Sequence, residues 1–385
     1  MRGRWLAAGV AWAAAVLLAA LAVYTATRRP DLFPDLTVYR AGAGAIEHGG
    51  DLYRVHGSNQ GGFTYPPFAV LVLWPLRLPP LLVSGLIVAA LSFLAAVVTA
   101  RVALRSVPVW VVGAVVACAM QTVAFRNSYA FGQIGVLLML LAVLDLLTDD
   151  PPWPRGMLIG IAVGIKLTPG VFVILLLLTR QRREAATAVA ALATSIALAA
   201  LILPVQSWRY WTDLAWHTGR VGDITSGRNR SLWGVLTHAG TPTEVAAAVA
   251  VVVAVLGLWW ASTAYRWSPV AAIATAGLTG CLVAPITWTH HLVWVLLVLC
   301  VAMSLRLHIL WRAGLVAATT IAFARLSPDT HLLAVLQAAN SAVLVIALPW
   351  IVRRRTIVPA AGSAPDPRAA SISDRPHSHQ GPGSA

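Results

Sequence analysis

The chain has few charged residues, and this scarcity excludes a soluble globular fold. Charged side chains make up 11% of the 385 residues, whereas apolar side chains make up 58%, and the mean hydropathy is +0.76. A soluble domain usually has about a quarter of its residues charged. The composition therefore predicts a protein that crosses a membrane several times.

Acidic residues are the scarcest charged groups, with 14 Asp and Glu against 28 Lys and Arg, so the net charge is +14. The basic residues occur as short clusters between apolar segments, such as "RQRRE" at 180–184 and "RRR" at 353–355. Such clusters mark the cytoplasmic ends of membrane spans. Because they leave no contiguous basic face, we expect no nucleic-acid partner.

Cysteine is also rare, which bears on disulfides and metal sites. The three cysteines, Cys118, Cys281 and Cys300, lie in apolar stretches without metal-ligand spacing. We therefore expect small buried apolar groups rather than disulfides or zinc ligands. Asp149 and Asp150 precede "PPWPR", a pattern typical of a turn. No metal and no cofactor are expected.

Long apolar segments predict an all-α polytopic membrane protein with about twelve transmembrane helices. The first segment, Trp5–Thr27, follows "MRGR" and is longer than a signal-peptide core, so we expect an uncleaved helix with a cytoplasmic N-terminus. The segment at 66–78 is short and bounded by prolines, which makes the stretch 66–147 a candidate for a re-entrant segment. The remaining expected spans are 66–78, 80–100, 107–122, 132–147, 156–178, 185–204, 243–263, 269–285, 288–304, 311–325 and 331–350.

This span count sets a topology. It places residues 28–66, 206–240 and 286–291 on the extracytoplasmic side and most basic clusters in the cytoplasm, as positive charges in short loops should be. Arg101 and Arg105 then fall on the outer side, against that rule.

The chain ends in a segment of different composition. Residues 353–385 are rich in Pro, Ser, Gly and Ala and hold too few large apolar residues to offset the entropy of ordering. We expect a membrane domain at 1–352 and a disordered cytoplasmic tail at 353–385.

The first outer loop is a candidate catalytic segment. Asp35 lies in it close to Tyr39 and Arg40. A carboxylate at the membrane surface beside an aromatic ring suits a general base acting on a sugar hydroxyl, and Arg40 would keep it ionised. The same residues fit the start of a helix after Pro34, with Asp35 in the first turn. Residue chemistry alone leaves both interpretations open.

Two further segments offer cations or hydrogen-bond donors to an anion. In "APITWTHHLVW", at 284–294, His290 and His291 lie at the outer end of a span, where they could bind a phosphate or serve as structural interface residues. The only lysine, Lys166, lies in "GIKLTPG" within an expected helix. A buried cation there would be functional, unless its side chain extends to the interface.

A third polar segment is "DITSGRNRSLWGVL" at 223–236, which contains Arg228 and Asn229 and offers a cation and an amide. Its "NRS" also matches an N-glycosylation acceptor, although so short a motif has a high false-positive rate.

Six short pieces in a fixed order resemble one family. The chain is similar to glycosyltransferase family 87, the polyprenol-phosphate-mannose-dependent alpha-mannosyltransferases of actinobacteria, which have the GT-C fold. The resemblance covers residues 35–294. The pieces are "DLTVYRAGAGAIEHGGDLY", "FTYPPFAVLVLWPL", "FGQIGVLLMLLAVLDLL", "GIAVGIKLTPGVFVILLLL", "NRSLWGVL" and "PITWTHHLVW".

The resemblance implies a function and a set of site residues. It implies the transfer of mannose from polyprenol-phosphate-mannose to a glycolipid or lipoglycan, with inversion at the anomeric carbon and formation of an alpha-(1,2) linkage. The reaction would take place on the extracytoplasmic face of the plasma membrane, where the protein contacts membrane lipids. Asp35 takes the place of the catalytic aspartate. The candidates for binding the donor phosphate are Lys166, His290, His291, Arg40 and Arg228, and those for lining the cavity are Tyr39, Tyr65, Gln133 and Asn229.

The alternative from another class is a transporter or flippase for a lipid-linked sugar, in which Lys166 would mark a site at the membrane midplane. Transporters of this kind are built from inverted repeats with broken helices. The sequence shows no such repeat, and its polar residues gather in loops on one face.

Overall fold

The computed structural model describes residues 2–58, 61–304 and 331–357, with the pairs 312–313, 316–317 and 319–320. Within these ranges the chain is helical and contains no strand, apart from an isolated bridge between His56 and Gly62. The expected all-α class is confirmed. The elements are α1 Arg2–Thr27, α2 Pro34–Glu47, η1 Leu52–Arg54, α3 Pro67–Leu73, η2 Trp74–Arg77, α4 Leu81–Ala103, α5 Val109–Gln121, α6 Val123–Phe131, α7 Gly135–Leu147, α8 Met157–Ile165, α9 Gly170–Leu178, α10 Arg182–Ile202, α11 Pro204–Thr212, η3 Leu214–Trp216, η4 Thr218–Arg220, α12 Leu232–His238, α13 Thr243–Tyr265, α14 Pro269–Val283, η5 Thr289–Trp294, α15 Val295–Ser304 and α17 His331–Ile357.

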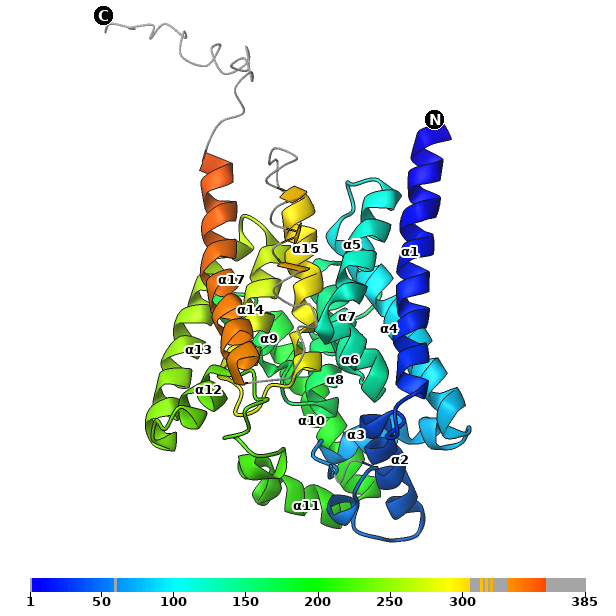
Figure 1. Ribbon diagram of the computed structural model, residues 1–385. Coiled ribbons are helices and arrows are strands. Elements are labelled where there is room, and N and C mark those ends of the chain that lie inside the picture. The colour runs from blue at the N-terminus through cyan, green and yellow to red at the C-terminus, as the bar shows by residue number, and fades with distance from the viewer. Residues whose placement is uncertain are drawn as a thin grey trace, which may run out of the picture.

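The long helices form a bundle with one polar end. The N-terminal end of α1 and the C-terminal end of α17 lie at one end, and α2, α3 and α11 gather at the other, which we call the α2 end (Figure 1). Of the described helices, α1, α4, α10, α13 and α17 are long and apolar enough to cross a membrane. The pair α5 and α6, bent by 73°, can add a sixth crossing. The expected count of twelve is not confirmed, and most of the expected span at 311–325 lies outside the described residues.

The expected span at 66–78 is wrong. Helices α3 and η2 have seven and four residues, a combined length of about 18 Å against a hydrocarbon core of about 30 Å. Prolines at 75, 79 and 80 end these helices, because proline has no N–H to continue the hydrogen-bond ladder. The chain therefore turns back at the α2 end.

Because the chain turns back here, the α4–α5 connection lies at the end of the bundle opposite to the one that the sequence predicts. The ring of Phe33, just after α1, packs on Gly85 near the start of α4, whereas Trp12 of α1 packs on Gly113 near the start of α5. Helix α4 therefore runs from the α2 end back to the N-terminal end of α1 (Figure 1). Arg101 and Arg105 lie at its far end, with the N-terminus, so the expected violation of the positive-inside rule is removed.

The expected single span at 156–178 is also wrong. Gly156 packs on Glu184, Gly160 on Ala188 and Gly164 on Ser195, so α8 and α10 run parallel. Helix α9 joins α10 through three residues, and so short a link makes neighbouring helices antiparallel. Helices α8 and α9 are therefore a hairpin of two nine-residue helices whose tip is the segment 166–169.

The break at this tip has a local cause. Pro169, the N-cap of α9, has no N–H to donate to the carbonyl of Ile165 four residues earlier, so the hydrogen-bond ladder of α8 cannot continue through it. Lys166 is extended, with φ −150° and ψ 131°, and follows the last residue of α8. The lysine is therefore at the tip of a half-length hairpin and not inside a continuous helix.

Candidate functional site

Asp35 is held in a well-packed first turn of α2. Phe33 takes a left-handed backbone conformation, its side chain is fully buried, and Pro34 then begins the helix. Asp35 lies in that turn, as the helix-start interpretation predicts. Its carboxylate, however, accepts a hydrogen bond from the side chain of Gln133, 2.5 Å away. The residue that begins the helix is therefore also available to the site.

A chain of hydrogen bonds orients the Gln133 amide. The Tyr39 hydroxyl donates to Oε1 of Gln133 at 3.2 Å, which leaves Nε2 to donate to Asp35. Tyr39 has only one hydroxyl proton, so in its 3.0 Å contact with Tyr65 the latter must donate. An ionised carboxylate can only accept, so Asp35 fixes the direction of this chain, whose members Tyr39 and Gln133 are buried. Three of the expected cavity residues, Tyr39, Tyr65 and Gln133, are thus brought together beside Asp35.

The surroundings of Asp35 shift its acidity. Burial raises the pKa of the Asp35 carboxyl above its usual value, while the Gln133 hydrogen bond and the charge of Lys166 oppose this shift. A raised pKa makes a carboxylate a stronger base. The arrangement therefore suits proton abstraction.

Lys166 and His291 meet at the tip of the α8–α9 hairpin. Nζ of Lys166 lies 3.3 Å from Nε2 of His291 and 5.2 Å from the centre of the Tyr65 ring. Nδ1 of His291 accepts the backbone N–H of Trp288 at 3.2 Å. A neutral His291 therefore has its proton on Nε2, facing the lysine ammonium. Two donors that converge in this way are suited to an anion oxygen between them.

His290 lies beside this pair without reaching the lysine in any described contact. Its buried ring packs edge-to-face against Phe131, at 5.4 Å, and His291, at 4.6 Å. Its Nδ1 has no hydrogen-bond partner within the described ranges. His290 is not among the residues that line the cavity beside Lys166 and His291.

A cavity opens next to Lys166 and His291. Lys166 and His291 line it together with Thr168, Gly277, Gly280 and Trp294. The two glycines lie on α14, and Gly277 lets the Trp294 ring pack against that helix. The walls are mostly apolar with one cation, Lys166, and the His291 donor on one side, which suits a ligand with an anionic group and an apolar part. Asp35, Tyr39, Tyr65 and Gln133 are not among its lining residues.

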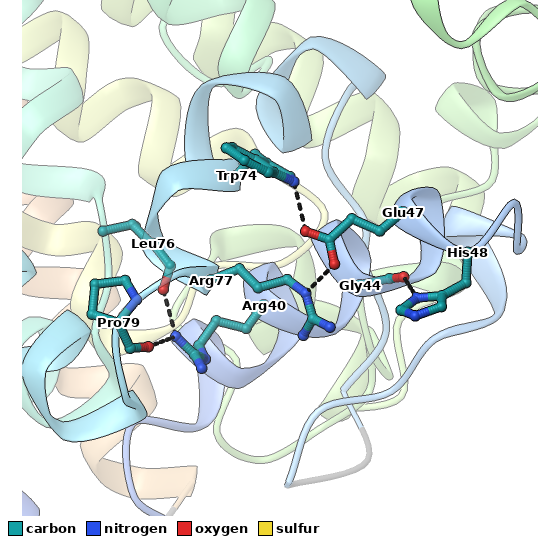
Figure 2. A network of polar contacts seen from close by, with 8 residues as sticks. All are labelled: Arg40, Gly44, Glu47, His48, Trp74, Leu76, Arg77 and Pro79. Atoms are coloured by element: carbon teal, nitrogen blue, oxygen red, sulfur yellow. Dashed lines mark hydrogen bonds and ion pairs between the residues drawn. The ribbon is translucent and has the colours of Figure 1, made fainter.

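Arg40 does not take part in this site, and the expected Asp35–Arg40 pairing is wrong. Its Nη1 donates to the carbonyls of Leu76, at 2.5 Å, and Pro79, at 2.7 Å (Figure 2). The Leu76 carbonyl needs such a donor because Pro80, four residues later, has no N–H. Arg40 therefore fastens α2 to the α3–α4 connection, and Gln133 takes the place expected for it beside Asp35.

The loop residues expected to contact substrate are placed differently. Arg228 is exposed. Asn229 is buried, and all four hydrogen-bonding positions of its amide are occupied, by Ile224 O, Pro285 O, Ser231 N and Thr287 N. Asn229 therefore joins the 223–231 loop to the segment just before η5, the helix that contains His291.

One group near the site was not predicted from the sequence. Arg209 of α11 forms a 2.5 Å ion pair with Asp51, and the rings of Tyr210 and Tyr53 stack with centres 5.7 Å apart. The Tyr53 hydroxyl donates to the carbonyl of Tyr65. The aromatic and basic pattern "SWRYW" at 207–211 was the available signal.

We expect Gln133→Met to lower the catalytic rate and to move the acidic limb of the pH–rate profile to higher pH. The Gln133 hydrogen bond lowers the pKa of Asp35, so its loss raises that pKa further and requires a higher pH for the ionised base. Gln181→Met, at the opposite end of the bundle, is the control. A lower rate with an unmoved acidic limb would contradict this role.

The comparisons with known proteins agree on one family. Residues 63–285 match glycosyltransferase family 87. This stretch includes Gln133 and Lys166 but neither Asp35 nor His291. No solved structure matches the chain.

Similar curated proteins come from mycobacteria. A polyprenol-phosphate-mannose-dependent alpha-(1-2)-phosphatidylinositol mannoside mannosyltransferase of Mycolicibacterium smegmatis is 35% identical, covering 82% of this chain and 81% of its own. A protein of the same name from Mycobacterium tuberculosis is 30% identical, covering 74% and 75%. A phosphatidylinositol pentamannoside mannosyltransferase of Mycobacterium tuberculosis is 32% identical, covering 68% and 64%.

Proposed function

Since this chain belongs to glycosyltransferase family 87, we propose that it transfers mannose from polyprenol-phosphate-mannose to a phosphatidylinositol mannoside or a related glycolipid. It is a multi-pass membrane hexosyltransferase. The donor and acceptor are those in the names of the mycobacterial relatives, and an alpha-(1,2) linkage is the product those names give.

One observation carries the proposed chemistry. The half-buried carboxylate of Asp35 lies within electrostatic range of Lys166, and Lys166 meets His291 with both nitrogens facing each other. A base and an anion site are thus held a short distance apart. A sugar attached to a phosphate at the anion site would present its anomeric carbon to an acceptor hydroxyl beside the base.

The reaction follows from these positions. Asp35 accepts the proton of the acceptor hydroxyl as that oxygen forms its bond to the anomeric carbon. The bond from the anomeric carbon to the phosphate oxygen breaks on the opposite face, and its electrons leave with the phosphate. Lys166 and His291 donate to the phosphate oxygens and stabilise the charge that develops there. A beta-linked donor gives an alpha product by this single displacement.

The distribution of basic clusters supports one side of the membrane for the site. Helix α2, at the α2 end, contains Asp35. The opposite end receives the C-terminal end of α4, followed by Arg105, the start of α10 with the basic cluster at 180–184, and the end of α17 with the cluster at 353–355. Positive charge in short loops favours the cytoplasm, which supports an extracytoplasmic site in the plasma membrane. Residues 1–352 would form the catalytic domain. Of the expected tail at 353–385, residues 353–357 belong to helix α17, and residues 358–385 lie outside the described ranges.

The assay for this function uses full-length protein purified in detergent. We expect transfer of mannose from polyprenol-phosphate-mannose to a phosphatidylinositol mannoside without added divalent metal, because Lys166 and His291 supply the charge stabilisation. GDP-mannose alone should give no product. Strict dependence on manganese would contradict the phosphate assignment. Movement of the lipid-linked sugar across liposomes without a transfer product would favour the flippase alternative.

A further inference from the structure

Helix α11 has its polar side turned inward and its apolar side turned outward. Ser207 and Tyr210 are buried, and Arg209 reaches inward to Asp51. On the outer side Trp208 is 74% exposed and Val205 73% exposed. An amphipathic helix on a water-facing surface has the opposite arrangement, with its apolar side against the protein.

The exposed apolar side continues an apolar surface that begins on α10. Leu198, Leu201 and Ile202, in the last turns of that membrane-crossing helix, are exposed, and Leu201 is 80% exposed. Val205 and Trp208 follow them on α11, and Trp216, at the end of η3, is 75% exposed. Helix α10 is a candidate span, so the surface it presents outward faces lipid. The surface formed by Leu201, Ile202, Val205, Trp208 and Trp216, here called the α11 surface, is an extension of it.

We propose that the α11 surface is a lipid-docking surface that lies in the headgroup layer at the α2 end of the membrane. Tryptophan is the residue typical of this layer, because its ring has an apolar body and one polar N–H. Its occupant is the bilayer itself, at the depth where α10 leaves the hydrocarbon. In Figure 1 α11 lies across the α2 end rather than along the bundle, as a helix in the membrane plane should.

The inward side of α11 connects the docked helix to the site. The Arg209–Asp51 ion pair and the stacked rings of Tyr210 and Tyr53 hold the segment that starts at Asp51. Arg220 lies over both tyrosine rings, at 5.2 and 5.7 Å from their centres. Tyr53 in turn holds Tyr65, whose ring lies under the ammonium of Lys166. A membrane-anchored α11 is therefore a brace for the segment that carries Tyr65.

The location is tested by nitroxide labels on single introduced cysteines in full-length protein in phospholipid nanodiscs. Sites 205 and 208 report on the α11 surface, site 94 on α4 is the lipid control, and site 223 is the aqueous control, each replacing an exposed residue. The unsubstituted protein, whose three native cysteines are buried or partly buried, gives the background.

We expect labels at 205 and 208 to collide more with dissolved oxygen than with a water-soluble nickel chelate, as at site 94. Collision with the chelate as frequent as at site 223 would place the surface in water and overturn the proposal. Protection from both reagents would mean that a second copy or another protein covers it, which also overturns the lipid assignment.

The brace is tested by amide hydrogen exchange in the same nanodiscs. We expect the double variant Trp208→Ser, Trp216→Ser to exchange several-fold faster than the parent protein within residues 51–58. Trp259→Ser, which removes an exposed tryptophan of α13, is the matched control and should leave this segment unchanged. Equal exchange in the parent and the double variant would overturn the brace, and neither measurement depends on the reaction catalysed.

Discussion

Asp35→Asn is expected to lower mannosyl transfer by about a thousand-fold, within the range of about 10² to 10⁴ that general-base catalysis contributes. Asparagine keeps the size of the side chain and can still accept the hydrogen bond of Gln133, so the packing of α2 should persist. It cannot take the proton of the acceptor hydroxyl. Initial rates with polyprenol-phosphate-mannose measure the loss, and thermal unfolding in detergent shows whether the fold is kept.

The control for this prediction is Asp31→Asn. Asp31 lies four residues earlier and forms an ion pair with Arg29 at 3.1 Å, at a partly exposed position. We expect this variant to keep most of the activity. If Asp35→Asn were folded and nearly as active as the parent protein, the general base would have to be another group.

The pH profile gives a second measure of the same base. Burial raises the pKa of Asp35, so its ionised form is lost at a higher pH than that of an ordinary aspartate. The rate should therefore fall on acidification through this raised pKa and be retained above it. An acidic limb below the usual range of an aspartate would be inconsistent with a buried base.

Lys166→Met is expected to lower the rate by about 10² to 10³, the loss typical when one donor to a developing negative charge is removed. Methionine keeps an unbranched apolar side chain at the hairpin tip but has no ammonium. His291 then remains as the nearest donor in the site, and the leaving phosphate loses its cation. The effect should be larger on kcat than on the KM for the donor, because charge develops in the transition state.

Two variants make this result specific. Arg228→Met removes an exposed cation from the 223–231 loop and should change the rate little. Replacing His291 by alanine should lower the rate by a smaller factor in the Lys166→Met protein than in the parent protein, because both groups contact the same phosphate. Fully additive losses, or a large loss in Arg228→Met, would indicate that the phosphate binds elsewhere.

Some of the site could be predicted because its residues are rare in this composition. Asp35, the single lysine and the paired histidines stand out in a chain with 14 acidic residues and one lysine. A charge in a mostly apolar chain needs a partner or a function, so each could be singled out without knowing the fold. The family resemblance placed Gln133 in the site and Lys166 with His291, but it could not give their contacts, since Gln133 lies 98 positions from Asp35 and His291 lies 125 from Lys166.

The sequence by itself determined the all-α membrane class, through composition and span length, and the family, through short motifs in a fixed order. Only the tertiary structure decided the roles of Arg40 and Asn229, since each could have faced substrate until its hydrogen bonds were seen to hold the backbone of another segment. It also decided that 156–178 is a hairpin, because hydropathy records that a segment is apolar but not the direction in which it runs. The parallel packing of α8 on α10 fixes that direction, and so places Lys166 at a tip beside His291.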